Sequence, residues 1–382
     1  MKILIVLTYY RPHISGLTIY VERLARALVK RGHQVTVLTS HYEHDLPMHE
    51  VIDGVTVIRH PVLFRLSKGS IMPGFLSHAW KLMSEHDVVS VHLPQAEGGP
   101  LAFIGRVLAR KPVVLTYHSD LQLPPGLLNR VVDSLVFTSN MMAGLFADKI
   151  SAYTQDFAQH SPFLSRFKNK IVVIPPPIES VPPDPVAVAV LKQRYQAEQR
   201  VIVGFAARFA EEKGIDYLLN SIPLVREKIP NVKYFFAGEY KNVIGENVWQ
   251  RLQPKIQQYR DYLEFLGPVP AHEMGNFFGA CDVLTVPSIN STDTFGLVQV
   301  EAMLSGCPSI ATNLPGVREP IRMTGMGQVI PIKDASALAD AIVHVVENRN
   351  RYLRPRVEIE KIFSLEHTVR EYEKLFSELQ PK

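Results

Sequence analysis

The sequence predicts an α/β protein made of two domains, each built on a parallel sheet. Short continuous runs of Ile, Leu and Val, such as residues 2–8, alternate with segments in which apolar residues recur at helical spacing. The length of 382 residues exceeds what a single core usually supports. A proline-rich stretch over residues 175–185 can continue neither a helix nor a central strand, so we place the domain boundary there. The expected domains are 1–177 and 178–363, followed by a last helix within 364–382.

The first domain opens with a strand–helix–strand unit, which predicts a parallel sheet. Residues 2–8 form the first strand, Gly16 introduces a helix that ends at Arg31-Gly32, and residues 34–39 form the next strand. A basic residue in the last turn followed by glycine is typical of a helix C-terminus. Further strands of this domain are expected at 51–59, 87–92, 112–116, 131–138 and 171–174.

After the proline-rich stretch, the second domain again alternates strands with helices. The chain ends in a helix for which Ser364 is the expected N-cap. The apolar runs and the helical periodicity predict strands at 200–206, 232–237, 261–266, 283–286 and 309–312, and helices at 297–306 and 335–347.

Composition and charge narrow the class of protein. The formal net charge is only +4, and no aromatic-rich basic stripe or zinc-ligand spacing is present, so nucleic acid is not an expected partner. The two cysteines lie in apolar surroundings, which argues against a disulfide framework. No apolar run approaches the roughly 18 residues of a membrane-spanning helix. We expect a cytoplasmic protein that contacts the inner face of the membrane, if at all, only peripherally.

The segment 62–83 mixes large apolar residues with Arg65, Lys68 and Lys81. One interpretation is an amphipathic patch that lies on an anionic membrane or holds a lipid-linked acceptor. The other is a helix that faces the core, with the basic side chains reaching outward to solvent. The sequence leaves both interpretations open.

The most informative stretch is 282–306. An apolar run over 283–286 reads as a buried strand, a polar loop follows, and helical spacing begins after Gly296. The first turn of that helix offers free N–H groups to an anion. Asp293 lies in the loop before the helix, and Glu301 lies inside it. Taken alone, Asp293 reads equally well as a helix cap and Glu301 as a solvated side chain.

This stretch resembles the E-x7-E signature of the retaining glycosyltransferases of family 4. The matching residues are Asp293, Phe295-Gly296-Leu297, Glu301-Ala302-Met303 and Gly306. The first carboxylate is an aspartate here, one methylene shorter than the glutamate of the family. The resemblance implies the GT-B fold, in which two Rossmann-like domains face each other across a cleft and the last helix packs back on the first domain. It also implies a nucleotide-sugar donor, bound by the second domain.

Two cations follow the strand 200–206. Arg208 and Lys213 lie five positions apart at the carboxyl end of this strand, where a bidentate guanidinium and an ammonium suit a pyrophosphate. Alone they would read as surface charges beside Glu211 and Glu212. They resemble the Arg-x4-Lys diphosphate site of the family.

Other site residues carry less local signal. His118 follows the strand 112–116, and ligands of open α/β sheets bind beyond the carboxyl ends of strands. A lone histidine is more often a satisfied core or loop residue, but the resemblance places it against the donor sugar, with Asp120 as a candidate to orient it. Gly16 stands where the family approaches the donor phosphate, although a tight turn explains it equally well. Val269 is a base contact by position only.

The resemblance as a whole implies a retaining hexosyltransferase that acts on a glycan or a lipid-linked acceptor. In this hypothesis Glu301 holds the ribose hydroxyls, while Asp293 and the amides of Phe295, Gly296 and Leu297 hold sugar hydroxyls. No Asp-x-Asp pair is present, so we expect no metal and no cofactor. The alternatives are a non-catalytic sugar-nucleotide-binding subunit, or a nucleotide-sugar epimerase or phosphorylase of the same fold. A dehydrogenase is disfavoured because the Gly-x-Gly-x-x-Gly fingerprint is absent.

Overall fold

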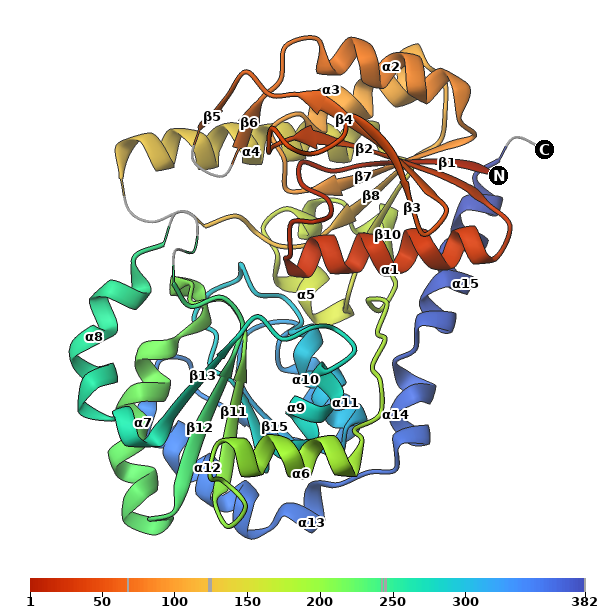
Figure 1. Ribbon diagram of the computed structural model, residues 1–382. Helices are drawn as coiled ribbons and strands as arrows, with labels where there is room; N and C mark the ends of the chain where they lie inside the picture. Colours follow the sequence, from red (N-terminus) through yellow and green to blue (C-terminus); the bar gives the residue numbers. More distant parts are fainter. Residues whose placement is uncertain (67–68, 123–125, 242, 244–245, 381–382) are drawn as a thin grey trace. The chain divides into compact units, whose positions relative to one another are not determined.

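The computed structural model describes residues 1–66, 69–122, 126–241, 243 and 246–380 (Figure 1). The chain folds into two compact units. One unit comprises Met1–Pro177 together with Ser364–Lys382, and the other comprises Ile178–Phe363. Each unit contains its own sheet and its own apolar core.

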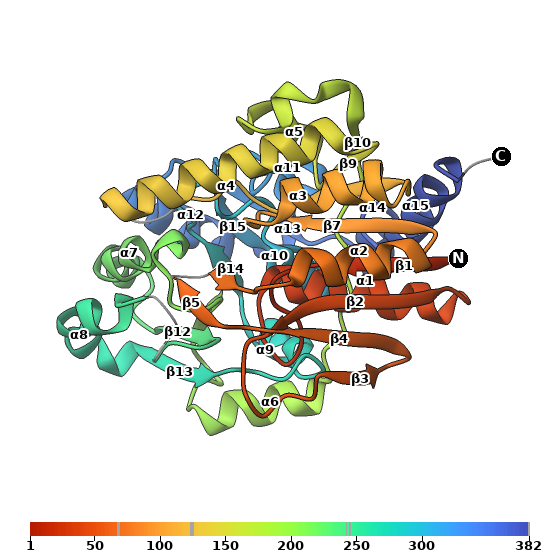
Figure 2. The same ribbon diagram turned by 90° about the horizontal axis from the view of Figure 1, so that it is seen from above.

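The first unit contains an eight-stranded sheet with the order β10-β9-β8-β7-β1-β2-β4-β3. All neighbours in it pair in parallel except β3 with β4. In Figures 1 and 2, helices α2, α3 and α4 lie on one face of this sheet and α1 on the other. The strands are β1 (Lys2–Val6), β2 (Gln34–His41), β3 (His49–Ile52), β4 (Val55–Pro61), β7 (Val88–Leu93), β8 (Val113–Tyr117), β9 (Lys149–Ala152) and β10 (Ile171–Val173), with the separate hairpin β5 (Phe64–Leu66) and β6 (Gly69–Ile71). The helices are α1 (Gly16–Lys30), α2 (Phe75–Glu85), α3 (Gly98–Phe103), α4 (Leu127–Phe146), α5 (Gln155–His160) and α15 (Leu365–Glu378).

The C-terminal helix α15 belongs to this first unit and packs beside α1. Ser364 caps it, as predicted, by accepting a hydrogen bond from the His367 amide. The buried hydroxyl of Tyr372 lies 2.7 Å from that of Tyr20 on α1. At the exposed end, Arg31 pairs with Glu373 at 2.7 Å. The helix is therefore fixed by a buried polar contact as well as by surface charges.

The second unit contains a six-stranded, fully parallel sheet with the order β13-β12-β11-β14-β15-β16. Each strand reads as an apolar run because both faces of such a sheet are covered. The strands are β11 (Val201–Ala206), β12 (Val232–Ala237), β13 (Leu263–Gly267), β14 (Val283–Val286), β15 (Ser309–Thr312) and β16 (Gly327–Ile330). The helices are α6 (Pro185–Arg194), α7 (Ile215–Lys228), α8 (Val248–Gln258), α9 (Met274–Ala280), α10 (Leu297–Leu304), α11 (Glu319–Thr324), α12 (Ala335–Glu347), α13 (Arg349–Tyr352) and α14 (Arg356–Ile362).

The predicted strand at 131–138 is wrong, because these residues form the middle of α4. Its Val and Phe residues favour a strand locally, but tertiary packing overrides that preference. Val131 and Leu135, four residues apart, are exposed while Val136 is buried, which is a helical pattern. The helix packs closely on α3, where Gly99 leaves no room for a side chain: a Cβ there would lie 2.7 Å from the Ser139 carbonyl oxygen.

The predicted strand at 51–59 is two antiparallel strands, β3 and β4. The turn between them is Asp53-Gly54, and both residues have positive φ, 51° and 81°. Two-residue hairpin turns prefer this dipeptide. The prediction of a single strand overlooked this turn signal. The sequence analysis also missed β9 and β16, each only four residues long.

The segment 62–83 combines a core-facing helix with an exposed apolar edge. Helix α2 buries Phe75, Ala79 and Met83 in the core. Leu63 and Trp80 are nevertheless 69% and 49% exposed. Lys68, one of the basic residues within this segment, lies outside the described residues. Within the described ranges, no helix is long and apolar enough to cross a membrane.

Candidate active site

The second unit has a topological switch point between β11 and β14. The chain leaves β11 toward β12 on one side, whereas β14 joins β11 on the other. The loops that follow these two strands therefore meet at the carboxyl edge of the sheet, where open α/β sheets bind ligands. The first loop carries Arg208 and Lys213, and the second carries Asp293 and leads into α10. The topology thus brings together Lys213 and Asp293, which are 80 positions apart in the chain.

Gly214 allows the two loops to touch. Its φ is +66°, and a Cβ there would lie 2.0 Å from the carbonyl oxygen of Pro287. The Ile289 amide donates to the Glu212 carbonyl oxygen at 2.9 Å beside this contact. Only glycine fits both the backbone conformation and the space.

Replacing Gly214 with alanine is expected to lower the free energy of unfolding by about 2–4 kcal/mol, through positive-φ strain and overpacking. Denaturant unfolding of the purified variant measures this loss of unfolding free energy. Gly16→Ala is the matched control, because a Cβ at Gly16 meets nothing within 4 Å. Equal stability of the two variants would contradict the close contact of the loops.

A partly buried ion pair connects the two loops. The Lys213 Nζ lies 2.8 Å from Asp293 Oδ2, and the buried Ser288 hydroxyl donates to the same oxygen at 2.6 Å. Burial alone would raise the pKa of Asp293, but the Lys213 ammonium and hydrogen bonds from Lys213, Ser288 and the Thr294 amide together lower it below its ordinary value. Asp293 is therefore ionised at neutral pH, although it is only 8% exposed.

Helix α10 presents uncapped amides next to this pair. Its N-cap is Gly296, with φ +70°, which has no side chain to cap the first-turn N–H groups. Leu297 and Val298, in the first turn of the helix, are half-buried. The buried Gln299 side-chain amide donates at 2.9 Å to the Phe295 and Val317 carbonyl oxygens and fixes the entry to the helix. The helix N-terminus and Lys213 therefore contribute positive potential to the same edge.

The remaining predicted residues of the second unit differ in their surroundings. Arg208 is half-buried, and among the described residues its guanidinium forms no hydrogen bond or ion pair. Glu301 is 8% exposed on α10. Phe295 is buried and packs edge-on against Phe363 at 5.6 Å between ring centroids. Val269 is half-buried two residues beyond β13. The ligand contacts assigned to these residues stay predictions.

In the first unit, Gly16 is the first residue of α1. Ser15 is the N-cap, and its hydroxyl accepts from the Thr18 amide at 3.2 Å. The Ser15 amide in turn donates to the Thr18 hydroxyl at 2.8 Å. This capping box satisfies one first-turn amide. A Cβ at Gly16 would meet no atom within 4 Å. Ser15 therefore stabilises the start of this helix.

His118 lies in a buried polar chain of the first unit. Its Nε2 is 2.8 Å from His92 Nδ1, and its Nδ1 bonds to the Tyr153 hydroxyl. Tyr20 packs against it edge-on at 5.0 Å. The expected orienting role of Asp120 is wrong, since Asp120 accepts from the Tyr117 hydroxyl at 2.9 Å and from the Ser161 hydroxyl at 2.6 Å instead. His92 and Tyr153 fix the imidazole of His118.

Burial keeps both histidines of this chain neutral. It lowers the pKa of His92 to about 3, and burial with the neighbouring His92 lowers the pKa of His118 well below its ordinary value. A neutral imidazole donates from one nitrogen and accepts at the other, which matches a chain with one partner at each nitrogen. No local sequence signal identified His92 as part of this chain. It lies on β7, which pairs with β8, and His118 directly follows β8.

His92→Asn is expected to reduce the loss of unfolding free energy that occurs as the pH falls. The folded-state pKa of His92 lies below the unfolded value near 6.5, so its contribution is fully present above about pH 6.5 and is lost as the pH falls toward about 3. Between pH 6.5 and 5 this loss is about 2 kcal/mol. Urea unfolding at both pH values should show a loss smaller by that amount in the variant. The exposed His272→Asn should behave as wild type, and an unchanged loss in His92→Asn would contradict the neutral chain.

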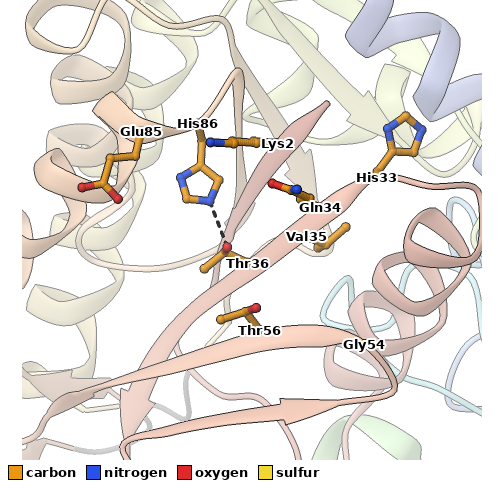
Figure 3. A pocket seen from close by; sticks show the side chains of 9 residues that line it. All are labelled: Lys2, His33, Gln34, Val35, Thr36, Gly54, Thr56, Glu85 and His86. Carbon is orange, nitrogen blue, oxygen red and sulfur yellow. Dashed lines mark hydrogen bonds between the residues drawn. The ribbon is translucent and has the colours of Figure 1, made fainter.

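A polar pocket of about 320 Å³ in the first unit is not part of this site (Figure 3). Lys2, Gln34 and Val35 line it at the amino ends of β1 and β2, opposite the edge where α/β sheets bind ligands. The ring of His86 is held there by Thr36 at 2.9 Å and by the Leu82 carbonyl oxygen at 2.6 Å. Both ring nitrogens of His86 therefore have partners within the protein.

The fold matches solved structures of GT-B glycosyltransferases. Sucrose-phosphate synthase from Thermosynechococcus elongatus gives a TM-score of 0.80 at 21% identity, over 99% of this chain and 98% of that chain. The Anabaena protein HepE in complex with UDP-glucose gives 0.79 at 18% identity, over 99% of this chain and 100% of that chain. The predicted α/β GT-B fold class is confirmed.

Sequence comparison identifies the family. Residues 14–180 match the model of Glycosyltransferase Family 4, and residues 200–348 match that of Glycosyl transferases group 1. The chain belongs to the family 4 glycosyltransferases. A phosphatidyl-myo-inositol mannosyltransferase of Mycobacterium tuberculosis is 26% identical over 92% of this chain and 90% of its own length. A GDP-mannose-dependent alpha-(1-6)-phosphatidylinositol monomannoside mannosyltransferase of Mycolicibacterium smegmatis is 25% identical over 91% and 90%.

Proposed function

We propose that this glycosyltransferase transfers a hexose from a nucleotide-diphosphate sugar with net retention at the anomeric carbon. The observation that carries the proposal is the switch point of the second unit. There, Lys213 and the uncapped amides of α10 lie at one edge of the sheet, with Arg208 on the same loop as Lys213. Such an edge suits a diphosphate.

The chemistry requires positive potential at this place. When the bond from the anomeric carbon to the diphosphate breaks, negative charge develops on a phosphate oxygen and the sugar ring becomes oxocarbenium-like. Arg208, Lys213 and the helix N-terminus stabilise the leaving group as that charge develops. Glu301 holds the ribose hydroxyls, and Val269 lies beside the base.

The acceptor hydroxyl attacks on the face that the diphosphate leaves. Its oxygen forms the new bond to the anomeric carbon, and its proton passes to a phosphate oxygen of the departing diphosphate. His118 exchanges no proton in this step, because both of its ring nitrogens are hydrogen-bonded within the protein. The step needs no enzymic nucleophile.

We also propose that transfer is independent of a divalent metal. Two basic side chains and a helix N-terminus supply the charge that Mg²⁺ or Mn²⁺ supplies elsewhere. Transfer should therefore proceed unchanged in excess EDTA. An activity that EDTA abolishes and Mg²⁺ restores would overturn this part of the proposal.

The relatives suggest which donor and acceptor to test first. Their names specify GDP-mannose and phosphatidylinositol lipids. In this chain, Leu63, Phe64 and Trp80 are exposed apolar residues, which lie before the β5–β6 hairpin, in that hairpin and on α2. They suit a peripheral contact with an anionic lipid surface. We propose a mannosyl donor and a lipid-linked acceptor.

The test is mannose transfer from radiolabelled GDP-mannose to phosphatidylinositol in mixed vesicles, with phosphatidylcholine vesicles and a soluble mannoside as controls. Labelled lipid is the expected product. Release of free mannose without transfer would support the donor and reject the acceptor. If GDP-mannose, UDP-glucose and other nucleotide sugars all fail to raise the melting temperature, the assignment of the switch point as a donor site fails.

A further inference from the structure

We infer that Glu97 binds hydroxyl groups of the acceptor at the carboxyl edge of the first unit's sheet. A carboxylate suits an acceptor ring with several hydroxyls, which is a sugar or a cyclitol. The inference rests on the proposed function, because it assigns an acceptor-binding residue to the same transfer reaction. The proposed diphosphate site lies in the second unit and does not use the loop that carries Glu97.

The first unit has its own topological switch point, between β1 and β7. The chain leaves β1 through α1 to β2 on one side, whereas β7 pairs with β1 on the other. The loops that follow β1 and β7 therefore meet at the carboxyl edge, where open α/β sheets bind ligands. The Thr8 hydroxyl of the first loop donates to the Gln95 side-chain oxygen of the second at 3.4 Å. Glu97 lies two residues after Gln95 in that second loop.

Glu97 is a half-buried carboxylate that lacks a cationic partner. Among the described residues, no lysine, arginine or histidine forms an ion pair with it. Burial raises the pKa of Glu97, and its own backbone amide is the only described group that lowers it. A charge that is removed from water without a partner costs free energy, and such carboxylates are common at functional sites. Hydroxyl groups of a bound acceptor would supply the missing donors.

The backbone around Glu97 is fixed by helix α4. The Ser139 hydroxyl on α4 donates to the Ala96 carbonyl oxygen at 2.6 Å, and it accepts from the Gly99 amide at 2.9 Å. These two bonds hold the chain on both sides of Glu97. The carboxylate is therefore positioned before the acceptor arrives, which lowers the entropy cost of binding.

Two buried polar side chains at this loop also have unpaired atoms. Gln95 is 6% exposed and Asn140 on α4 is 2% exposed. Among the described residues, neither Gln95 Nε2 nor Asn140 Oδ1 has a hydrogen-bond partner. The two side chains are neighbours, because a Cβ at Gly98 would lie 3.7 Å from Asn140 Oδ1 and 3.8 Å from Gln95 Cγ. Unpaired buried polar atoms are rare in folded proteins, so they mark this loop as a place that a polar ligand or ordered water completes.

The first test compares melting temperatures without any ligand. Glu97→Gln keeps the shape of the side chain and removes the unpaired charge, so it should raise the melting temperature at pH 8 by about 2–4 °C. The gain should shrink as the pH falls toward 4.5, the ordinary pKa, because a protonated carboxyl group is as neutral as the amide. Glu85→Gln, at an exposed position on α2, should melt as wild type. A lower or unchanged melting temperature in Glu97→Gln would mean that the protein itself satisfies the carboxylate, and the inference would be overturned.

The second test measures transfer. Initial rates are recorded with GDP-mannose and either phosphatidylinositol in mixed vesicles or a soluble mannoside, which separates a cyclitol from a sugar acceptor. For the acceptor that the wild type glycosylates, Glu97→Gln should raise KM about tenfold, because a charge-assisted hydrogen bond becomes a neutral one. The KM for GDP-mannose should stay the same. An unchanged acceptor KM overturns the inference. If the wild type binds no nucleotide sugar, the proposed function fails instead, and the melting temperatures still test the role of Glu97.

Discussion

Lys213→Ala is expected to reduce kcat for sugar transfer by about a thousandfold. The substitution removes a fixed cation from the place where leaving-group charge develops, and removal of one such group commonly lowers kcat by about 10²–10³. It also leaves Asp293 buried without its ion-pair partner, which lowers stability. Initial rates with saturating donor, measured at a temperature where the variant is folded, test the prediction.

The control for this variant is Lys228→Ala. Lys228 is an exposed lysine at the end of α7, and its removal should leave kcat unchanged. The double variant Lys213→Ala/Asp293→Asn removes both charges of the pair and should recover stability without recovering activity. A Lys213→Ala enzyme with a wild-type rate would remove Lys213 from the mechanism.

Glu301→Ala is expected to weaken GDP binding by roughly a hundredfold. A carboxylate that accepts from two ribose hydroxyls contributes charge-assisted hydrogen bonds of about 1.5–3 kcal/mol each. The 2′,3′-dideoxy nucleotide lacks both hydroxyls, so it should bind the wild-type enzyme and the variant equally. Titration of both nucleotides against both proteins measures the effect.

Pyrophosphate binding and Glu358→Ala serve as controls. Pyrophosphate has no ribose, so its affinity should be the same in Glu301→Ala as in the wild type. Glu358 is an exposed glutamate on α14, and its substitution should alter the binding of neither nucleotide. If Glu301→Ala weakens binding of the dideoxy nucleotide as much as binding of GDP, Glu301 acts on the fold or on the phosphates rather than on the ribose.

The regular elements with strong apolar patterns were predictable. The strands at 232–237 and 309–312 and the helix at 335–347 have the predicted bounds. Each is a compact apolar run or a long helical period with clear ends, so local pattern and tertiary structure agree. The segment 131–138 was not predictable in this way, because close packing against α3 decides its conformation.

The candidate site was only partly predictable. Arg208 and Lys213 follow a strand, and α10 follows another, so their placement at a sheet edge is a consequence of the α/β pattern. The partners of these residues were not predictable. The residues around Ser288 carry no sign of its bond to Asp293, and nothing local connects His92 with His118.

By itself, the sequence determined the fold class, the family and the residues that face the carboxyl edges of the strands, because these depend on periodicity and on short contiguous motifs. Only the tertiary structure decided that Lys213 pairs with Asp293 and that His118 is enclosed by His92 and Tyr153. Such pairings depend on which strands become neighbours and on how closely their loops approach, as at Gly214. That information is spread over the whole chain rather than held in any one segment.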